Sequence, residues 1–287
     1  MNLLNITQEV LALEQELQHK PFLTNKEEII HTLGDLLIKA VEKRCKGRIG
    51  IAFSGGIDST LLAFICFTLK KDFILYNTGI KGSSDVEWAT KIANFYNWNM
   101  KQQIYSIEEA EVILKKVVKI IPDPTVTKTG IAAPEYAVLE MAKKDQIDTL
   151  FGGLGAEEIY AGYGRHKQAL KDNRVHEECW DGLKKVYEND LLRDLAVINY
   201  FEINMQCPFL DKEVVKYSMQ IHPQFKITEE HKKLILLETA VYLGLEKEFA
   251  YRPKKAAQYG SGFHFAIEKL AKKKGFKLKK EYLDSLQ

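Results

Sequence analysis

The sequence predicts an α/β protein built around a parallel β-sheet. Short, strongly apolar runs at 48–53, 72–77 and 148–153 are typical of buried strands, and 101–107 is a weaker strand candidate. Helical patterns separate these runs. Strands that alternate with helices of this length form βαβ units, in which helices cover both faces of a parallel sheet. The chain has 287 residues, enough for one large domain.

Helical periodicity accounts for most of the remaining chain. Two amphipathic helices are expected before the first strand, at 5–18 and 25–44, with Thr24 as the N-cap of the second and Glu27 three residues later. The helices expected between the strands are 58–70, 84–97, 108–119 and 134–144.

Strand signals stop after about residue 163. Helices are expected beyond it at 164–189, 190–202, 211–220, 228–243 and 262–273. These patterns predict a single domain in three parts: N-terminal helices at 1–45, an α/β nucleotide-type core at 46–163 and a helical part at 164–287. An open parallel sheet binds ligands beyond the carboxyl ends of its strands, and the three most unusual loops follow such ends.

Composition excludes several classes of protein. The net charge of +2 favours neither a nucleic acid nor a membrane as partner, and no apolar run is long enough to span a membrane. Residues 1–20 carry acids and amides at helical spacing, unlike a signal peptide. The four cysteines are widely separated, with no CxxC pair, which argues against a zinc site or a disulfide scaffold and favours a reducing cytoplasm.

The stretch "FSGGIDST" (53–60) joins a predicted strand to a predicted helix. Gly55 and Gly56 let backbone N–H groups turn inward, Ser54 and Ser59 add hydroxyl donors, and the following helix directs its positive end at the same point; these features suit phosphate oxygens. A carboxylate beside phosphates, here Asp58, requires a cation such as Mg²⁺ between them. No Lys is present, so this is not a GxxxxGK[ST] loop. The alternative is a glycine turn with polar caps.

"SGGIDS" resembles the pyrophosphate-binding loop of the ATP-pyrophosphatase (PP-loop) enzymes. Later stretches are similar to the synthetase domain of asparagine synthetases and β-lactam synthetases, and the similarity covers about 46–265. Those stretches are "GLGAEEIYAGYGRH" (153–166), "LLRDL" (191–195), "CPFLDKEVV" (207–215), "FKITEEHKKLILLETA" (225–240) and "RPKKAAQYGSG" (252–262). The resemblance implies a PP-loop core that binds ATP and Mg²⁺.

The loop after the strand at 148–153 resembles the family pattern S-G-E-G-[AS]-D-E. Gly153 permits close backbone approach, and the resemblance implies that Glu157 is the second magnesium-binding acid, opposite Asp58. Glu158 offers a further carboxylate to the substrate pocket. Leu154 stands where asparagine synthetases carry a Glu, so it can neither accept a proton nor pair with ammonium. The alternative is a solvated acidic helix start, stabilised by the helix dipole.

The strand at 72–77 leads into a second loop of interest. The resemblance implies that Asn77, Thr78 and Gly79 line the adenine and ribose through backbone contacts. Asp85 and Glu87, a few residues later, are better explained as first-turn acids that complement a helix dipole.

"RPKKAAQYGSG" contributes the catalytic residue that the resemblance implies. The family holds a lysine over the reacting carbonyl in this segment, and Lys254 matches it best, with Lys255 as the second choice. A fixed cation there stabilises the pentavalent phosphate and then the tetrahedral oxyanion, for about 3–4 kcal/mol. Solvated surface lysines are the alternative.

Other motif residues are expected to have structural roles. Asp211 is expected to cap a helix, and Arg193 and Asp194 to form a helix-borne ion pair near the site. Arg165 and His166 are expected to pack or cap. The seven lysines between 269 and 280 are better explained as a solvated helix than as an RNA contact.

The function predicted is an ATP-dependent amide-forming ligase. The substrate carboxylate attacks the α-phosphorus of ATP, giving acyl-AMP and pyrophosphate, and ammonia or an amine then displaces AMP. Asparagine synthetases carry an N-terminal glutaminase, for which the stretch before residue 46 is too short. Free ammonia, a separate glutaminase subunit and an amine on the substrate all stay open as nitrogen sources, as does a homodimer. The rival functions are an RNA-modifying PP-loop enzyme and a non-catalytic ATP-binding module.

Overall fold

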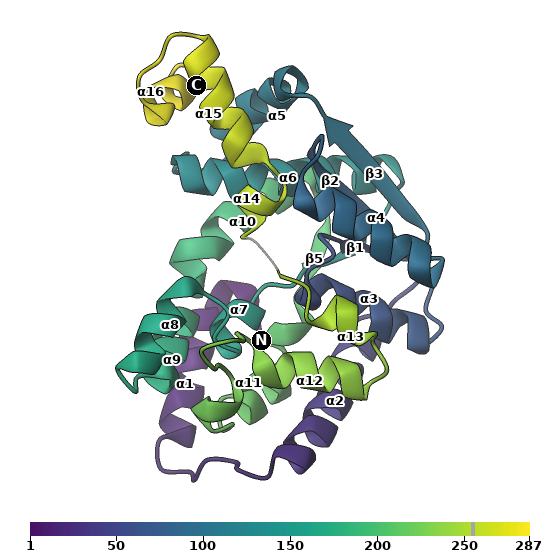
Figure 1. The fold of residues 1–287 in the computed structure, drawn as a ribbon, viewed down its shortest axis with the longest axis vertical. Coiled ribbons are helices and arrows are strands. Elements are labelled where there is room, and N and C mark those ends of the chain that lie inside the picture. Colours follow the sequence, from purple (N-terminus) through teal and green to yellow (C-terminus); the bar gives the residue numbers. More distant parts are fainter. Residues whose placement is uncertain (254–255) are drawn as a thin grey trace.

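A five-stranded, wholly parallel sheet forms the centre of the computed structural model, which describes residues 1–253 and 256–287 (Figure 1). The strand order is β3-β2-β1-β4-β5. The strands are β1 (Ile49–Ala52), β2 (Phe73–Ile80), β3 (Met100–Tyr105), β4 (Thr149–Phe151) and β5 (Asn204–Gln206). Registered parallel pairs join each strand to its neighbour. The predicted α/β class with a parallel sheet is therefore confirmed.

The sheet separates two apolar cores because consecutive side chains of a strand point to opposite faces. Ile49 and Ile51 of β1 pack into one core, together with α3 (Ile57–Thr68) and α4 (Ser84–Tyr96). Ile74 and Tyr76 of β2 pack into the other. That second core is completed by α5 (Ile107–Ile120), α6 (Val126–Lys144), α10 (Leu192–Phe201), α15 (Phe263–Lys273) and α16 (Lys279–Asp284). Both faces are covered, as a parallel sheet requires.

The N-terminal helices α1 (Ile6–Leu17) and α2 (Lys26–Glu42) pack on the first core, close to the predicted ranges. The predicted cap is wrong by one residue: the side chain of Asn25, not Thr24, accepts a hydrogen bond from the backbone N–H of Glu28. Asn is at least as favourable an N-cap residue as Thr, so residue type alone did not distinguish position 24 from position 25. Helix α6 begins eight residues before the predicted start, because Thr125 caps it and its internal Pro134 does not end it.

Helices dominate the second half of the chain, as predicted, but most are shorter than the predicted ranges. They are α7 (Ala156–Ile159), α8 (Gly164–Lys171), α9 (Val175–Val186), α11 (Lys212–Ser218), α12 (Leu234–Tyr242), α13 (Lys247–Ala250) and α14 (Ala257–Gly260). The single helix expected at 164–189 is wrong: the chain breaks between α8 and α9, where Asn173 is left-handed, and continues after α9 into a π-helical turn at Tyr187–Leu191.

The expectation that strands end before residue 163 is also wrong. Strand β5 adds the edge of the sheet by pairing Asn204, Met205 and Gln206 with β4. Its three residues are partly or fully exposed and include two amides, so they carry no apolar signal. The helical half therefore contributes a strand to the α/β core.

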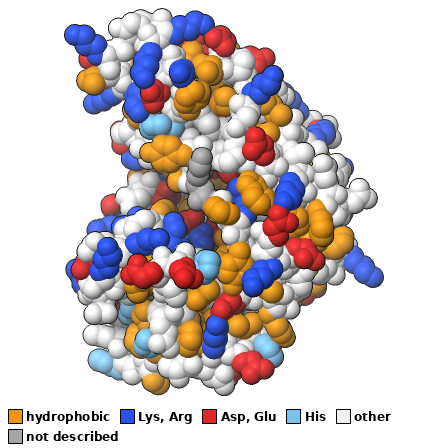
Figure 2. Space-filling model, in the orientation of Figure 1, with side chains coloured by type: hydrophobic (Ala, Val, Ile, Leu, Met, Phe, Trp, Pro, Cys, Tyr) orange, Lys and Arg blue, Asp and Glu red, His pale blue; other side chains and the backbone are white. Residues whose placement is uncertain are grey.

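The molecule is hollowed on one face. Figure 2 shows a recess below α15, with Lys and Arg side chains gathered along its lower rim, over α8. No helix in the described part of the chain combines the length and the apolar composition needed to cross a membrane.

Candidate functional site

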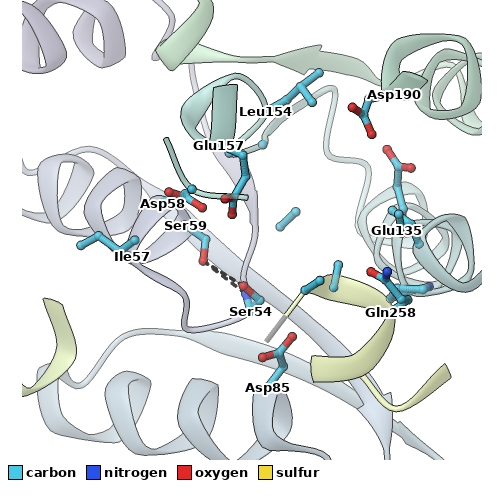
Figure 3. A pocket seen from close by; sticks show the side chains of 18 of the residues that line it. Ser54, Ile57, Asp58, Ser59, Asp85, Glu135, Leu154, Glu157, Asp190 and Gln258 are labelled. Carbon is cyan, nitrogen blue, oxygen red and sulfur yellow. Dashed lines mark hydrogen bonds between the residues drawn. The ribbon is translucent and has the colours of Figure 1, made fainter. Parts of the chain in front are cut away.

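The loop between β1 and α3 is a tight turn that only glycine allows. Gly55 has φ +66°, and a Cβ there would lie 2.9 Å from the backbone nitrogen of Ala89. The hydroxyls of the loop bind its own backbone: Ser59 Oγ donates to the Gly56 carbonyl at 3.2 Å, and Ser54 Oγ accepts from the Gly56 N–H at 3.3 Å. These hydrogen bonds fix the shape of the loop at the positive end of α3, where Ser54 and Ser59 lie side by side (Figure 3).

Two carboxylates converge on one buried cation beside this loop. The Nζ atom of Lys233 lies 2.7 and 2.8 Å from the two carboxylate oxygens of Asp58 and 2.8 Å from Oε1 of Glu157. The side chains of Lys233 and Asp58 are each 6% exposed, and that of Glu157 is 26% exposed. Asp58 and Glu157 are 99 positions apart in sequence (157 − 58), and the pairing of β1 with β4 brings their loops together.

Glycines make this approach feasible. A Cβ on Gly162 would lie 1.9 Å from a carboxylate oxygen of Glu157 and 2.2 Å from Cε of Lys233. A Cβ on Gly153 would lie 2.8 Å from Cβ of Asp58. The close approach predicted at Gly153 is therefore present, whereas Gly162 has the tighter contact.

Lys233 was missed by sequence reasoning. It lies in "HKKLIL", where a lysine beside other charges is usually solvated, yet it is 5% exposed. It adopts a left-handed conformation (φ +56°) as the residue before α12, and this turns its side chain into the protein. The one signal in the sequence is its position directly ahead of the apolar run at 234–237, which begins α12.

A second buried ion pair supports the loop from the other side. Arg252 donates to the carbonyl of Ser54 and to Oδ1 of Asp85, both at 2.9 Å. Asp85 is indeed in the first turn of α4, but its side chain is 3% exposed and pairs with that guanidinium, so it is more than a dipole complement. Asn77 donates to the Phe53 carbonyl at 2.7 Å, fixing the start of the same loop.

These groups open onto one cavity of about 1060 Å³. Predicted site residues that line it are Ser54, Asp58, Ser59, Asn77, Thr78, Gly153, Leu154 and Glu157. Those that do not line it are Gly55, Gly56 and Gly79, together with Glu158. Lys254 and Lys255 lie outside the described residues.

Glu158 is placed behind the cavity wall, contrary to the pocket role predicted for it. It is 2% exposed and accepts a hydrogen bond from the Tyr163 hydroxyl at 2.7 Å. Burial, and next the charge of Asp190, raise its pKa to about 7. His166 caps, as expected: its Nδ1 accepts from the Tyr163 backbone N–H at 3.1 Å.

The expected structural pairs are present. Arg193 contacts Asp194 at 2.6 Å and Asp190 at 3.0 Å, and all three line the cavity. Asp211 caps α11 by accepting from the Glu213 N–H at 3.1 Å.

A parallel sheet whose first strand leads into a glycine-serine turn, facing a large cavity at the carboxyl edge, defines the class of open α/β proteins that bind ligands beyond their strand ends. Within that class, the chain belongs to the asparagine synthase family, whose model matches residues 32–174 and 168–284.

Two relatives show the extent of the similarity. A putative glutamine-hydrolyzing asparagine synthetase of Methanocaldococcus jannaschii is 33% identical, over 91% of this chain and 55% of that protein. A probable one from Acanthamoeba polyphaga mimivirus is 27% identical, over 83% of this chain and 44% of that protein. The chain thus spans about half the length of these relatives.

Among solved structures, an NH3-dependent NAD synthetase from Campylobacter jejuni matches with a TM-score of 0.35 and 19% identity. The match covers 63% of this chain and 93% of that one. That score is too low to support a conclusion about this chain.

Proposed function

We propose that the chain is an ATP-dependent ligase that activates a carboxylate as an acyl-adenylate and transfers the acyl group to ammonia or an amine. The observation that carries this proposal is the convergence of Asp58 and Glu157 on one cation, beside a phosphate-type loop and at the mouth of a substrate-sized cavity. Membership of the asparagine synthase family supports it.

The loop residues are assigned to the pyrophosphate that leaves. Ser54 and Ser59 offer hydroxyls, and the backbone of Gly55 and Gly56 offers N–H groups at the positive end of α3. Such fixed donors hold the two outer phosphates and leave the α-phosphorus open to the carboxylate oxygen.

The carboxylates of Asp58 and Glu157 are suitable ligands for Mg²⁺. Asp58 and Glu157 already share one cation, and Mg²⁺ takes one or two carboxylates and completes its shell with phosphate oxygens and water. When bound, Mg²⁺ would neutralise the phosphate charge that builds up as pyrophosphate departs. In the structure Lys233 Nζ provides positive charge at this point, so it competes with the metal or moves toward the phosphates.

The remaining roles follow from the resemblance. Asn77, Thr78 and Gly79 are assigned to adenine and ribose, and Gly153 to close approach of the backbone. Lys254, with Lys255 as the second choice, is assigned to the charge that develops at the phosphorus and then at the carbonyl carbon. Both lysines follow Arg252, which the structure anchors to the loop carbonyl of Ser54.

The cavity also suits an intermediate that water would destroy. An acyl-adenylate hydrolyses readily, so the site must exclude water. Helices α6, α10, α12 and α14 form part of the cavity wall, to which they contribute Val138, Ile198, Leu237 and Ala257.

The acceptor is proposed to be ammonia or an amine. Relatives are named glutamine-hydrolyzing, so a glutaminase on a separate subunit, free ammonia and an amine on the substrate are the proposed nitrogen sources. Leu154 lines the cavity without a group that can bind ammonium. We place the reaction in the cytoplasm.

The test is product analysis with ATP, Mg²⁺ and a panel of amino-acid carboxylates, with and without ammonium chloride. The proposal predicts that one carboxylate stimulates formation of AMP and pyrophosphate. Formation of ADP and phosphate instead would contradict it. Pyrophosphate release that depends on tRNA and on no carboxylate would favour the RNA-modifying alternative.

A further inference from the structure

The cavity has a second charged wall, opposite the nucleotide loop. Glu135 from α6, Asp190 from the π-helical turn, and Arg193 and Asp194 from α10 all line it. Figure 3 shows Glu135 and Asp190 with their carboxyl groups turned toward each other, across the cavity from Asp58 and Glu157. Polyphosphate would be repelled from this wall, so it faces the other substrate.

The wall holds more acids than its one arginine neutralises. Arg193 is 6% exposed on its side chain and contacts both Asp194 and Asp190, within 3.0 Å. Glu135 is the third acid, and it forms no ion pair with any other residue that the structure describes. Its Oε2 atom is buried, and no group of the described residues donates a hydrogen bond to it. A buried carboxylate oxygen without a donor needs a ligand or a proton.

Glu135 and Asp194 are neighbouring buried acids, and burial raises the pKa of both, so the pair keeps a proton more readily than two exposed carboxyl groups would. Burial raises the pKa of Glu135 well above its ordinary range, and the negative charge of Asp194 raises it further. The charged groups that face it are Arg193, Asp194 and Asp190; the buried thiol of Cys207 is also close, and its own pKa is raised by burial. Of the two acids, Glu135 therefore keeps a proton more readily than Asp194 does.

We propose that Glu135 binds the nitrogen nucleophile as an ammonium ion and accepts a proton from it during amide formation. This assignment rests on the proposed function. An ammonium ion supplies the cation and the hydrogen-bond donors that the wall lacks. On binding it displaces the proton of Glu135 to solvent, which leaves a carboxylate paired with a cation.

Amide formation from ammonium releases two protons and exchanges one bond at the acyl carbon. One N–H proton moves from ammonium to the Glu135 carboxylate and leaves ammonia. The nitrogen attacks the acyl carbon, a C–N bond forms, and the bond from that carbon to the phosphate oxygen breaks, so AMP departs with the electron pair. The second proton leaves with the AMP phosphate. A carboxyl group with a raised proton affinity suits this step, because a base works best when its pKa is close to the working pH. Leu154, in the same cavity, has no group that could do it.

The first test does not depend on activity. The carboxyl ¹³C resonance of Glu135 is followed against pH in protein labelled with ¹³C-glutamate, with Glu135→Gln to assign the signal. We expect an apparent pKa above that of the exposed glutamates in sodium chloride, and a fall of ~1 unit or more when ammonium chloride replaces it at the same ionic strength. A signal that titrates with the exposed glutamates, or that does not distinguish the two salts, would overturn the proposal.

The second test separates the two half-reactions in Glu135→Gln. Carboxylate-dependent exchange of pyrophosphate into ATP should stay within about threefold of wild type, while ammonium-dependent amide formation should fall roughly 100-fold or more, the usual effect of removing a general base. Glu140→Gln is the matched control, since Glu140 is on the same helix and pairs with Lys116 on the surface. Retained amide formation, or equal loss of both half-reactions, would refute the assignment. If wild type shows no exchange, the proposed function fails, and the ¹³C titration still decides the ammonium site.

Discussion

Replacing Lys233 by Met tests the three-way contact at the candidate metal position. The ammonium lies within 2.8 Å of both Asp58 and Glu157, and the Lys233 and Asp58 side chains are each only 6% exposed, so water screens their attraction little. Removing one partner of a buried ion pair costs about 3–5 kcal/mol. At roughly 2 °C per kcal/mol for a chain of this size, the Tm should fall by ~6–10 °C.

The assay is thermal unfolding followed by circular dichroism, first with EDTA and then with added Mg²⁺. The control is Lys119→Met, an exposed lysine in the last turn of α5. Mg²⁺ should stabilise the Lys233→Met variant more than wild type, because a divalent ion can take the place of the ammonium. When the Mg²⁺ concentration is tenfold above its Kd for the folded variant, Mg²⁺ binding should raise the free energy of unfolding by about 1.4 kcal/mol. A variant that melts with wild type in EDTA, or that gains no more from Mg²⁺ than wild type does, would refute the reasoning.

Three further substitutions, at Gly162, Asp85 and His166, test buried contacts near the candidate metal position and the loop at Ser54. Gly162→Ala puts a Cβ 1.9 Å from the nearest carboxylate oxygen, so pyrophosphate release should fall at least tenfold, whereas Gly164→Ala, with nothing within 4 Å of its Cβ, should behave as wild type. Asp85→Asn removes the buried carboxylate partner of Arg252 and should lower the free energy of unfolding in urea by about 3 kcal/mol; an unchanged midpoint would show that the pair is not formed. Burial lowers the pKa of His166 to about 4, so its stabilising contribution is complete above pH 6.5 and is lost as pH falls toward 4. Wild type should lose ~3 kcal/mol from this group across that window, and His166→Asn should not; parallel pH profiles would contradict the assignment.

The sequence allowed prediction of the parts of the fold that depend on local pattern. Strands β1, β2 and β4 are apolar runs, and the loop at Ser54 carries its chemistry in six adjacent residues. Its tight turn at Gly55 follows from the same residues. Strand β5 was missed because it pairs with only one neighbouring strand and two of its three residues are polar amides.

The parts that were missed depend on contacts between distant segments. Lys233 is buried because a loop 175 positions away in sequence brings Asp58 to it (233 − 58), and nothing in its immediate neighbours signals this. Glu135 and Asp194 both lie in helices that the sequence predicts, at 134–144 and 190–202, but a local pattern does not show that these two helices face the same cavity.

The most direct test of the central claim is the fate of the carboxylate oxygen. The active carboxylate is labelled with ¹⁸O and incubated with protein, ATP, Mg²⁺ and ammonium chloride, and AMP is analysed by mass spectrometry. Attack of the carboxylate on the α-phosphorus predicts one ¹⁸O atom in AMP for each amide formed. Amide formation with unlabelled AMP, or with the label in inorganic phosphate beside ADP, would contradict it.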